Sequence, residues 1–184
     1  MRLYSLIVFG LSLGATTLAA HVPENAEVVF RDDFSTGAWN GAILAREGAY
    51  GVVGPALTAG SYGDTLLFSQ EVDITLGDED YITFNFSSTG YQILRILAWE
   101  GADSLPRVMT VTHFPSGKVQ HVDVPLQGNF HNYHWRQGDY DDLDPGDRVV
   151  RLGLEFNLGE EVTPAVAVGE ISVYRLTLDY YRAQ

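Results

Sequence analysis

The side chains best suited to contact a ligand are concentrated in one short run, His131-Asn132-Tyr133-His134-Trp135-Arg136. Flat aromatic rings stack on the C–H faces of sugar rings, and amide, carboxylate and guanidinium groups bond to sugar hydroxyls. On a strand, alternate side chains point to opposite faces, so Tyr133 and Trp135 would share one face and Arg136 would lie on the other. The run predicts ligand binding by Tyr133, Trp135 and Arg136; burial of one face in a hydrophobic core is the structural alternative.

Two more aromatic residues lie in polar, glycine-containing segments that are typical of loops. Trp39 precedes an Asn-Gly pair, and Tyr62 lies between Gly-Ser and Gly-Asp. Loops held by a rigid scaffold carry many binding residues, so we predict that Trp39 and Tyr62 also contact a ligand. Trp99 differs, because it follows an apolar Ile-Leu-Ala run and is predicted at the edge of the core.

The segment Asp139–Asp147 carries five carboxylates within nine residues. Calcium prefers oxygen ligands, so such a segment is a candidate cation loop. It lacks the glycine at the sixth position and the glutamate at the twelfth that define an EF-hand loop. A solvated acidic loop is therefore the preferred interpretation.

Catalytic motifs give no comparable signal. Residues 21–184 contain no G-x-S-x-G, H-E-x-x-H or phosphate-binding loop. Cleavage after Ala20 would make His21 the N-terminal residue, and an N-terminal histidine with a second histidine resembles the copper site of lytic polysaccharide monooxygenases. Paired carboxylates could hydrolyse a glycan, but no spacing singles out two of the acidic residues. A polysaccharide-active enzyme, whether hydrolase, lyase or copper oxygenase, stays an alternative.

Residues 1–20 are predicted to be a secretory signal peptide. Arg2 supplies a positive charge, residues 3–13 form a mostly apolar run that is short for a bilayer span, and small residues lead up to Ala20. The chain has no cysteine, which excludes a disulfide framework and a lipid-anchored cysteine. We expect a secreted protein, extracellular or periplasmic, without a membrane anchor.

Residues 21–184 are sufficient for a single β-sandwich domain with its own core. Loss of Arg2 with the leader would change the net charge from −13 to −14. A surface of this charge repels nucleic acid and anionic membranes and attracts cations. The composition therefore argues against a nucleic-acid partner and favours cation binding.

Alternation with a period of two dominates the apolar pattern, and helical periodicity is nearly absent. Tyr81–Ser87 and Val119–Val124 alternate between apolar and polar residues, as half-buried strands do. About a dozen such segments, separated by Gly, Pro, Asp and Asn, predict an all-β, two-sheet antiparallel β-sandwich of the jelly-roll type. The strands expected at the centre are Tyr81–Ser87, Gln92–Glu100 and Val149–Asn157.

Three further predictions concern individual strands. The turn at Pro115–Lys118 predicts that Arg107–Pro125 forms a β-hairpin. A strand is expected over His131–Arg136, and the final strand is expected over Ile171–Tyr181, since apolar and aromatic residues continue to that point.

Val29–Trp39 contains an acidic-Phe-x-x-Gly-x-Trp pattern, Phe68–Phe84 covers two core strands, and Val168–Leu176 has an acidic residue before alternating apolar ones. In this order they resemble the opening, second, third and closing strands of galactose-binding-like jelly rolls, a family with many secreted carbohydrate-binding modules. The opening pattern also resembles lectin-like, laminin-G-type sandwiches, so the choice between the two jelly-roll types stays open.

In the galactose-binding-like family, a structural calcium ion often lies where the first and last strands meet. The resemblance implies Asp32 or Asp33 and Glu170 as metal ligands, with carbonyl oxygens completing the six to eight that calcium takes. Acidic residues that cap turns or face solvent are the structural alternative.

Taken together, these features predict a secreted, non-catalytic carbohydrate-binding module whose partner is a polysaccharide or other glycan. The polysaccharide-active enzyme is the first alternative. A structural or adhesion protein without a sugar ligand is the second.

Overall fold

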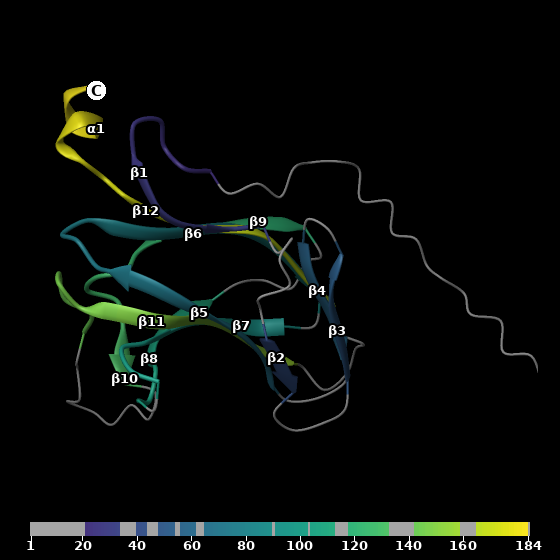
Figure 1. The fold of residues 1–184 in the computed structure, drawn as a ribbon. Coiled ribbons are helices and arrows are strands. Elements are labelled where there is room, and N and C mark those ends of the chain that lie inside the picture. The colour runs from purple at the N-terminus through teal and green to yellow at the C-terminus, as the bar shows by residue number, and fades with distance from the viewer. Residues whose placement is uncertain are drawn as a thin grey trace, which may run out of the picture.

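The computed structural model is a sandwich of two antiparallel β-sheets, with one short helix at the end of the described chain (Figure 1). It describes residues 21–33, 40–43, 48–53, 56–61, 65–89, 91–102, 104–112, 118–132, 142–158 and 165–183. The elements are β1 (Glu27–Asp32), β2 (Asn40–Ile43), β3 (Gly48–Val53), β4 (Ala56–Ser61), β5 (Thr65–Thr75), β6 (Asp80–Thr89), β7 (Tyr91–Trp99), β8 (Arg107–Thr112), β9 (Val119–Pro125), β10 (His131–Asn132), β11 (Arg148–Leu158), β12 (Ala165–Arg175) and α1 (Leu178–Arg182). The predicted all-β sandwich is confirmed. The predicted leader lies outside the described residues.

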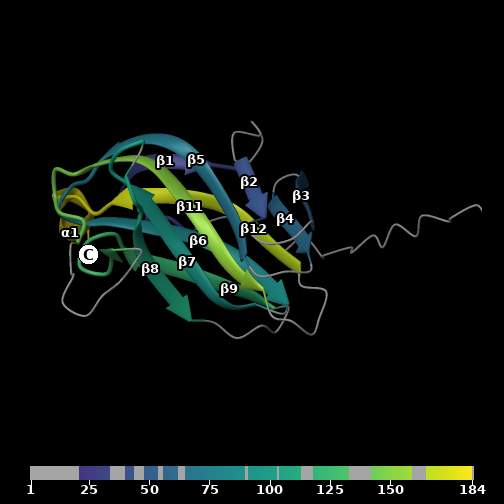
Figure 2. The same cartoon turned by 90° about the horizontal axis from the view of Figure 1, so that it is seen from below.

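We call the two sheets A and B. Sheet A has the strand order β3-β4-β12-β6-β9, with β1 also paired to β12, and sheet B has the order β10-β8-β7-β11-β5-β2. Figure 2, viewed from below, brings the strands of sheet B toward the viewer. The three strands predicted at the centre are interior: β6 lies between β12 and β9, β7 between β8 and β11, and β11 between β7 and β5.

Alternate side chains of both sheets meet in one hydrophobic core. Phe84 and Phe86 of β6 and Leu154 and Phe156 of β11 belong to it and are at most 1% exposed. Burial of such a side chain contributes about 1.5–3 kcal/mol relative to leaving it in water. This alternation holds the sheets together in a chain that has no cysteine.

Strand β12 is paired along one edge by β6 and along the other by two different strands. On that second edge β4 pairs with Ala165–Val168, and β1 pairs with Ile171–Arg175. Gly169 and Glu170 have no Cα partner in the registers of these three ladders. The change from β4 to β1 therefore leaves an irregular stretch of β12 next to the end of β1.

A buried ion pair fixes the opposite end of β12 to the start of β6. Arg175 and Asp80 are partners in the ladder, and the guanidinium donates to both carboxylate oxygens, at 2.6 and 2.9 Å. Asp80 is fully buried and also accepts the Gly77 N–H at 2.8 Å. A Cβ at Gly77 would lie 2.3 Å from Arg175 Nε, so this turn requires glycine.

Two strand predictions need correction, and a third is described only in part. Arg107–Pro125 is not a hairpin: β8 pairs with β7 and β10 in sheet B, whereas β9 pairs with β6 in sheet A. The last strand ends at Arg175, and Leu178–Arg182 is helical, with Thr177 as its N-cap. Of the strand predicted over His131–Arg136, the structure describes His131–Asn132 as β10, and the remainder lies outside the described residues.

Candidate functional site

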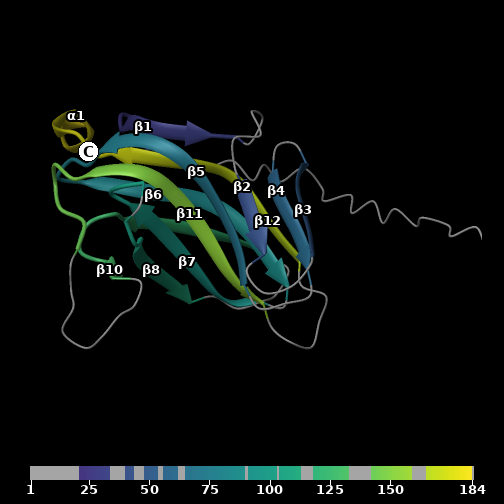
Figure 3. The same cartoon turned by 60° about the horizontal axis from the view of Figure 1, so that its bottom comes forward.

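A polar pocket opens at the edge of the sandwich, between the end of β1 and strand β5. Figure 3 shows β1 and β5 passing this edge together with β12. The cavity has a volume of about 420 Å³ and is lined by Arg31, Asp32, Asp33, Gln70 and Glu170. The structure thus brings together the three acidic residues that the family resemblance implied as calcium ligands.

Strand register explains why these side chains meet. Asp32 is the ladder partner of Ile171, a fully buried core residue, and Asp32 itself is only 7% exposed. On β5, Gln70 is opposite the core residue Leu152 and therefore points toward the interior. Asp32 of sheet A and Gln70 of sheet B thus each place a polar side chain at an inward position, at the edge of the sandwich.

The mouth of the pocket is crossed by an ion pair. Arg31 Nε lies 3.2 Å from Glu170 Oε1, and the side chains of Arg31 and Glu170 are 51% and 22% exposed. Ser172, which is fully buried, donates its hydroxyl to the same Glu170 oxygen at 3.3 Å. Glu170 is therefore directed toward Arg31 and Ser172.

Two features of the pocket suit a cation with oxygen ligands. Gln70 Oε1 is buried and has no hydrogen-bond partner in the described part of the chain, and a buried acceptor without a donor is costly. The irregular stretch at Gly169 and Glu170 of β12 adjoins the pocket, which Glu170 lines. Carboxylates and an amide oxygen are of the ligand types that calcium takes.

The carboxylates do not yet form a closed metal cage. Among the described residues, no three Asp, Glu, His or Cys side chains converge closely enough to hold a metal ion as they stand. Glu170 is instead paired with Arg31 at the mouth of the pocket.

The outer face of sheet B carries a second group of polar and aromatic side chains. Arg95 of β7 and Glu155 of β11 are ladder partners on this face and form an ion pair. Glu155 is only 2% exposed, and Arg95 is 31% exposed. Burial of a charged pair on an outer face holds its hydrogen-bonding groups in fixed positions.

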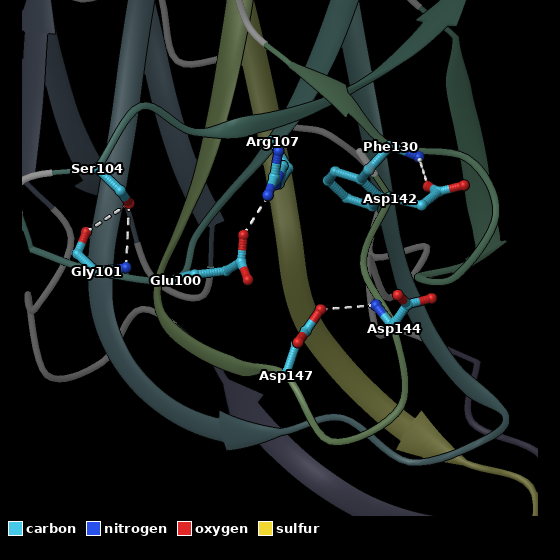
Figure 4. Close-up of polar contacts among 8 residues, drawn as sticks. All are labelled: Glu100, Gly101, Ser104, Arg107, Phe130, Asp142, Asp144 and Asp147. Atoms are coloured by element: carbon cyan, nitrogen blue, oxygen red, sulfur yellow. Dashed lines mark hydrogen bonds and ion pairs between the residues drawn. The ribbon is translucent and has the colours of Figure 1, made fainter. Parts of the chain in front are cut away.

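Trp99 and Arg151 continue this face toward the end of β7. The Arg151 guanidinium lies 5.4 Å from the centre of the Trp99 ring, a cation–π arrangement. Trp99 is 7% exposed and packs with Leu97 and Val108 in a small second core. Beyond the strand end, Arg107 binds Glu100 at 2.8 Å (Figure 4). Trp99 is thus a packing residue at the edge of the core, as predicted, and not a free platform.

The acidic loop uses its described carboxylates to cap backbone groups. Asp142 accepts the Phe130 N–H at 2.9 Å, and Asp147 accepts the Asp144 N–H at 2.7 Å (Figure 4). Gly146, with a φ of 97°, closes the same turn. These contacts favour the interpretation of a structural acidic turn over a calcium loop.

All five predicted ligand-contacting residues lie outside the described residues: Trp39, Tyr62, Tyr133, Trp135 and Arg136. Their places in the sequence are still informative. Trp39 directly precedes β2, and Tyr133 directly follows β10, which are the two edge strands of sheet B. Tyr62 follows β4 of sheet A.

Sequence reasoning missed two residues of the edge pocket, Arg31 and Gln70. Gln70 did give a signal, since it takes an inward position in a strand whose other inward residues, such as Phe68 and Ile74, are apolar. Arg31 gave none, because its partner Glu170 is distant in the sequence.

Comparisons with solved structures define the fold. The family 11 carbohydrate-binding module from Clostridium thermocellum, in complex with a β-1,3-1,4-mixed-linked tetrasaccharide, is similar with a TM-score of 0.55, 12% identity, and coverage of 80% of this chain and 95% of that one. No protein-family model matches the sequence, and no curated protein matches it. The jelly-roll resemblance seen in the sequence is therefore confirmed as a resemblance of fold.

Two other proteins share this fold with different roles. A cleaved adhesin domain of Lys-gingipain from Porphyromonas gingivalis has a TM-score of 0.51 at 7% identity, with 79% of this chain and 98% of that chain covered. The enzymatically active domain of a tailspike protein from bacteriophage CBA120 has a TM-score of 0.53 at 11% identity, with 78% and 20% covered. The fold is thus that of a jelly-roll β-sandwich, and the function depends on the sites.

Proposed function

We propose that this chain is a secreted, non-catalytic carbohydrate-binding module whose glycan surface is the outer face of sheet B. The observation that carries the proposal is the ion pair of Arg95 with the buried Glu155 on this face. Trp39 and Tyr133 adjoin the two edge strands of this sheet, and a buried ion pair lies between those edges. Aromatic rings beside fixed polar groups are the elements of a sugar site.

The chemistry of this face suits an uncharged sugar. Arg95, which is 31% exposed, offers guanidinium N–H donors for sugar hydroxyls, and the nearly buried Glu155 holds it in place. The pair has no net charge, and the chain as a whole is strongly acidic, which repels anionic polysaccharides. We therefore expect neutral glycans to bind more tightly than uronic-acid or sulfated ones.

Binding without catalysis is supported by the sequence, because residues 21–184 contain no G-x-S-x-G, H-E-x-x-H or phosphate-binding loop. Secretion is supported by the leader-like sequence of residues 1–20. Among the described residues, no helix is long and apolar enough to cross a membrane.

A glycan array combined with a reducing-sugar release assay tests the function. We expect the mature chain to bind neutral glycans and to release no reducing ends. Release would show an enzyme, and absence of any bound glycan would support the structural or adhesion role. Both results would contradict the proposal.

Substitutions on the proposed surface test its place. Tyr133→Ala, Trp135→Ala and Glu155→Gln should each weaken binding about tenfold or more, as loss of a central contact does. Arg182→Met is the control, because Arg182 pairs with Asp179 in an exposed contact within α1, outside sheet B. Equal affinity of all four variants would place the glycan elsewhere.

We further propose that the edge pocket binds a structural calcium ion through Asp32, Asp33 and Glu170. The buried Gln70 oxygen supports this assignment, because it lacks a donor within the described chain. A cation there would offset the repulsion between the carboxylates and would tie the end of β1 to β12. The ion would supply electrostatic cross-linking and no chemistry.

A further inference from the structure

The guanidinium of Arg31 is a positive charge at the mouth of the pocket in which we propose that calcium binds. The guanidinium reaches Glu170 at 3.2 Å and contacts the Ser172 hydroxyl at 3.5 Å. Arg31 and Ser172 are ladder partners, so the strand pairing of β1 with β12 sets this contact. The side chain is half exposed and can therefore swing into solvent without disturbing the core.

The pocket without Arg31 would be strongly negative. It would hold three carboxylates and the amide oxygen of Gln70 around one cavity. Like charges in a partly buried site repel each other far more than they would in water. The Arg31–Glu170 ion pair reduces this repulsion as long as no metal ion is bound.

We propose that Arg31 is a tethered competitor of calcium for Glu170, an inference that rests on the calcium site proposed above. In the calcium-free protein, Arg31 holds Glu170 at the mouth and keeps the pocket stable. Calcium binding requires Glu170 to leave Arg31 and to turn toward Asp32 and Asp33. Arg31 thus lowers the affinity for calcium and reduces the dependence of the fold on the ion.

Calorimetric titration of the mature chain with calcium alone tests the proposal. Arg31→Met removes the charge and keeps the aliphatic stem, so calcium should bind about tenfold more tightly, as expected when a nearby cation is removed from a partly buried site. Arg31→Lys keeps the charge and should bind calcium nearly as the unmodified chain does.

Arg148→Met is the matched control for net charge. It also removes one arginine, but from an exposed pair with Asp73 at 2.8 Å between β5 and β11. Its calcium affinity should change by less than about twofold, because Arg148 does not line the pocket and its exposed charge is screened by water and salt.

A second readout follows Arg31 directly. In NMR spectra, the Arg31 Nε–H signal, assigned by its loss in Arg31→Met, should shift on addition of calcium, while the Arg148 signal should not. If calcium leaves the Arg31–Glu170 pair intact, the Nε–H should exchange with water as slowly as before, and Arg31 is not a competitor.

The outcomes separate the two proposals. The competition is supported if Arg31→Met binds calcium more tightly than the unmodified chain and Arg148→Met does not. It is also supported if Arg31→Met binds calcium and the unmodified chain binds none. Suppose that the unmodified chain binds calcium. If Arg31→Met then binds calcium no more tightly than the unmodified chain, or gains no more affinity than Arg148→Met, Arg31 is not a competitor and the calcium site stands. If neither the unmodified chain nor Arg31→Met binds calcium, both proposals are overturned.

Discussion

The indole ring of Trp99 fills the space that a side chain at position 153 would occupy. A Cβ on Gly153 would lie 2.9 Å from Trp99 Cζ3 and 3.1 Å from the carbonyl oxygen of Phe68. Gly153 is on β11 and Trp99 on β7, so the glycine lets the indole cross from its own strand onto the next. The outer face of sheet B depends on this close approach.

Gly153→Ala should therefore destabilise the protein by about 1–3 kcal/mol, the usual cost of overpacking. Chemical denaturation followed by tryptophan fluorescence measures the change. Gly101→Ala is the control, because the nearest atoms to a Cβ there, in Ser104, are 3.7 Å away. Equal stability of the two variants would show that Trp99 yields easily.

Asp80→Ala should be more damaging, since it leaves the Arg175 guanidinium and the Gly77 N–H without their acceptor. Asp80 accepts three hydrogen bonds, and a hydrogen bond to a charged group contributes about 1.5–3 kcal/mol. Urea unfolding measures the loss. Asp73→Ala, which removes an exposed carboxylate paired with Arg148, should leave the midpoint nearly unchanged. Similar midpoints for both variants would contradict a structural role for the buried pair.

Tyr174 should make stability fall at alkaline pH. Burial raises the pKa of the Tyr174 phenol above its ordinary value of 10.0, and the hydrogen bond to Asp123 raises the pKa further. The neutral phenol is thus favoured in the folded state. Its contribution is fully present below pH 10.0 and is lost as pH rises through the higher folded pKa.

Tyr174→Phe should therefore lower stability at neutral pH by about 1–2 kcal/mol, through loss of the bond to a carboxylate. Above pH 10.0, unfolding curves of the variant should change less with pH than those of the unmodified chain. Equally steep alkaline limbs would assign the pH dependence to other groups.

Calcium should raise the melting temperature of the mature chain. A ligand present at a hundredfold excess over its dissociation constant stabilises a fold by about 2.7 kcal/mol. Asp33→Ala or Glu170→Ala should remove most of this gain, and magnesium at matched ionic strength should not reproduce it. Asp144→Ala, in the acidic turn, is the control. If Asp144→Ala removes the gain instead, the acidic turn is the site.

Much of the fold could be predicted because strand patterns are local. Ile82, Phe84 and Phe86 alternate with polar residues along β6, and all three are in the core. The end of the chain misled the same reasoning. Tyr180 and Tyr181 look like strand residues, but Thr177 caps a helix there, and its hydroxyl accepts the Tyr180 N–H.

The candidate site residues were harder to predict than the strands. Asp32, Asp33 and Glu170 came from a family resemblance, and the structure places all three around one pocket. The aromatic candidates came from residue type alone, which cannot tell a platform from a packing residue. Trp99 illustrates the difficulty, because its burial follows from the missing side chain at Gly153 on another strand.

The sequence by itself determined the alternation of strands, the positions of turns and the strong negative charge, because each depends on residues close together in the chain. Only the tertiary structure decided which strands pair. The turn at Pro115–Lys118 signals a change of direction, yet β8 and β9 belong to opposite sheets. The same holds for Arg31 and Glu170, since residues far apart in sequence meet only when β1 pairs with β12.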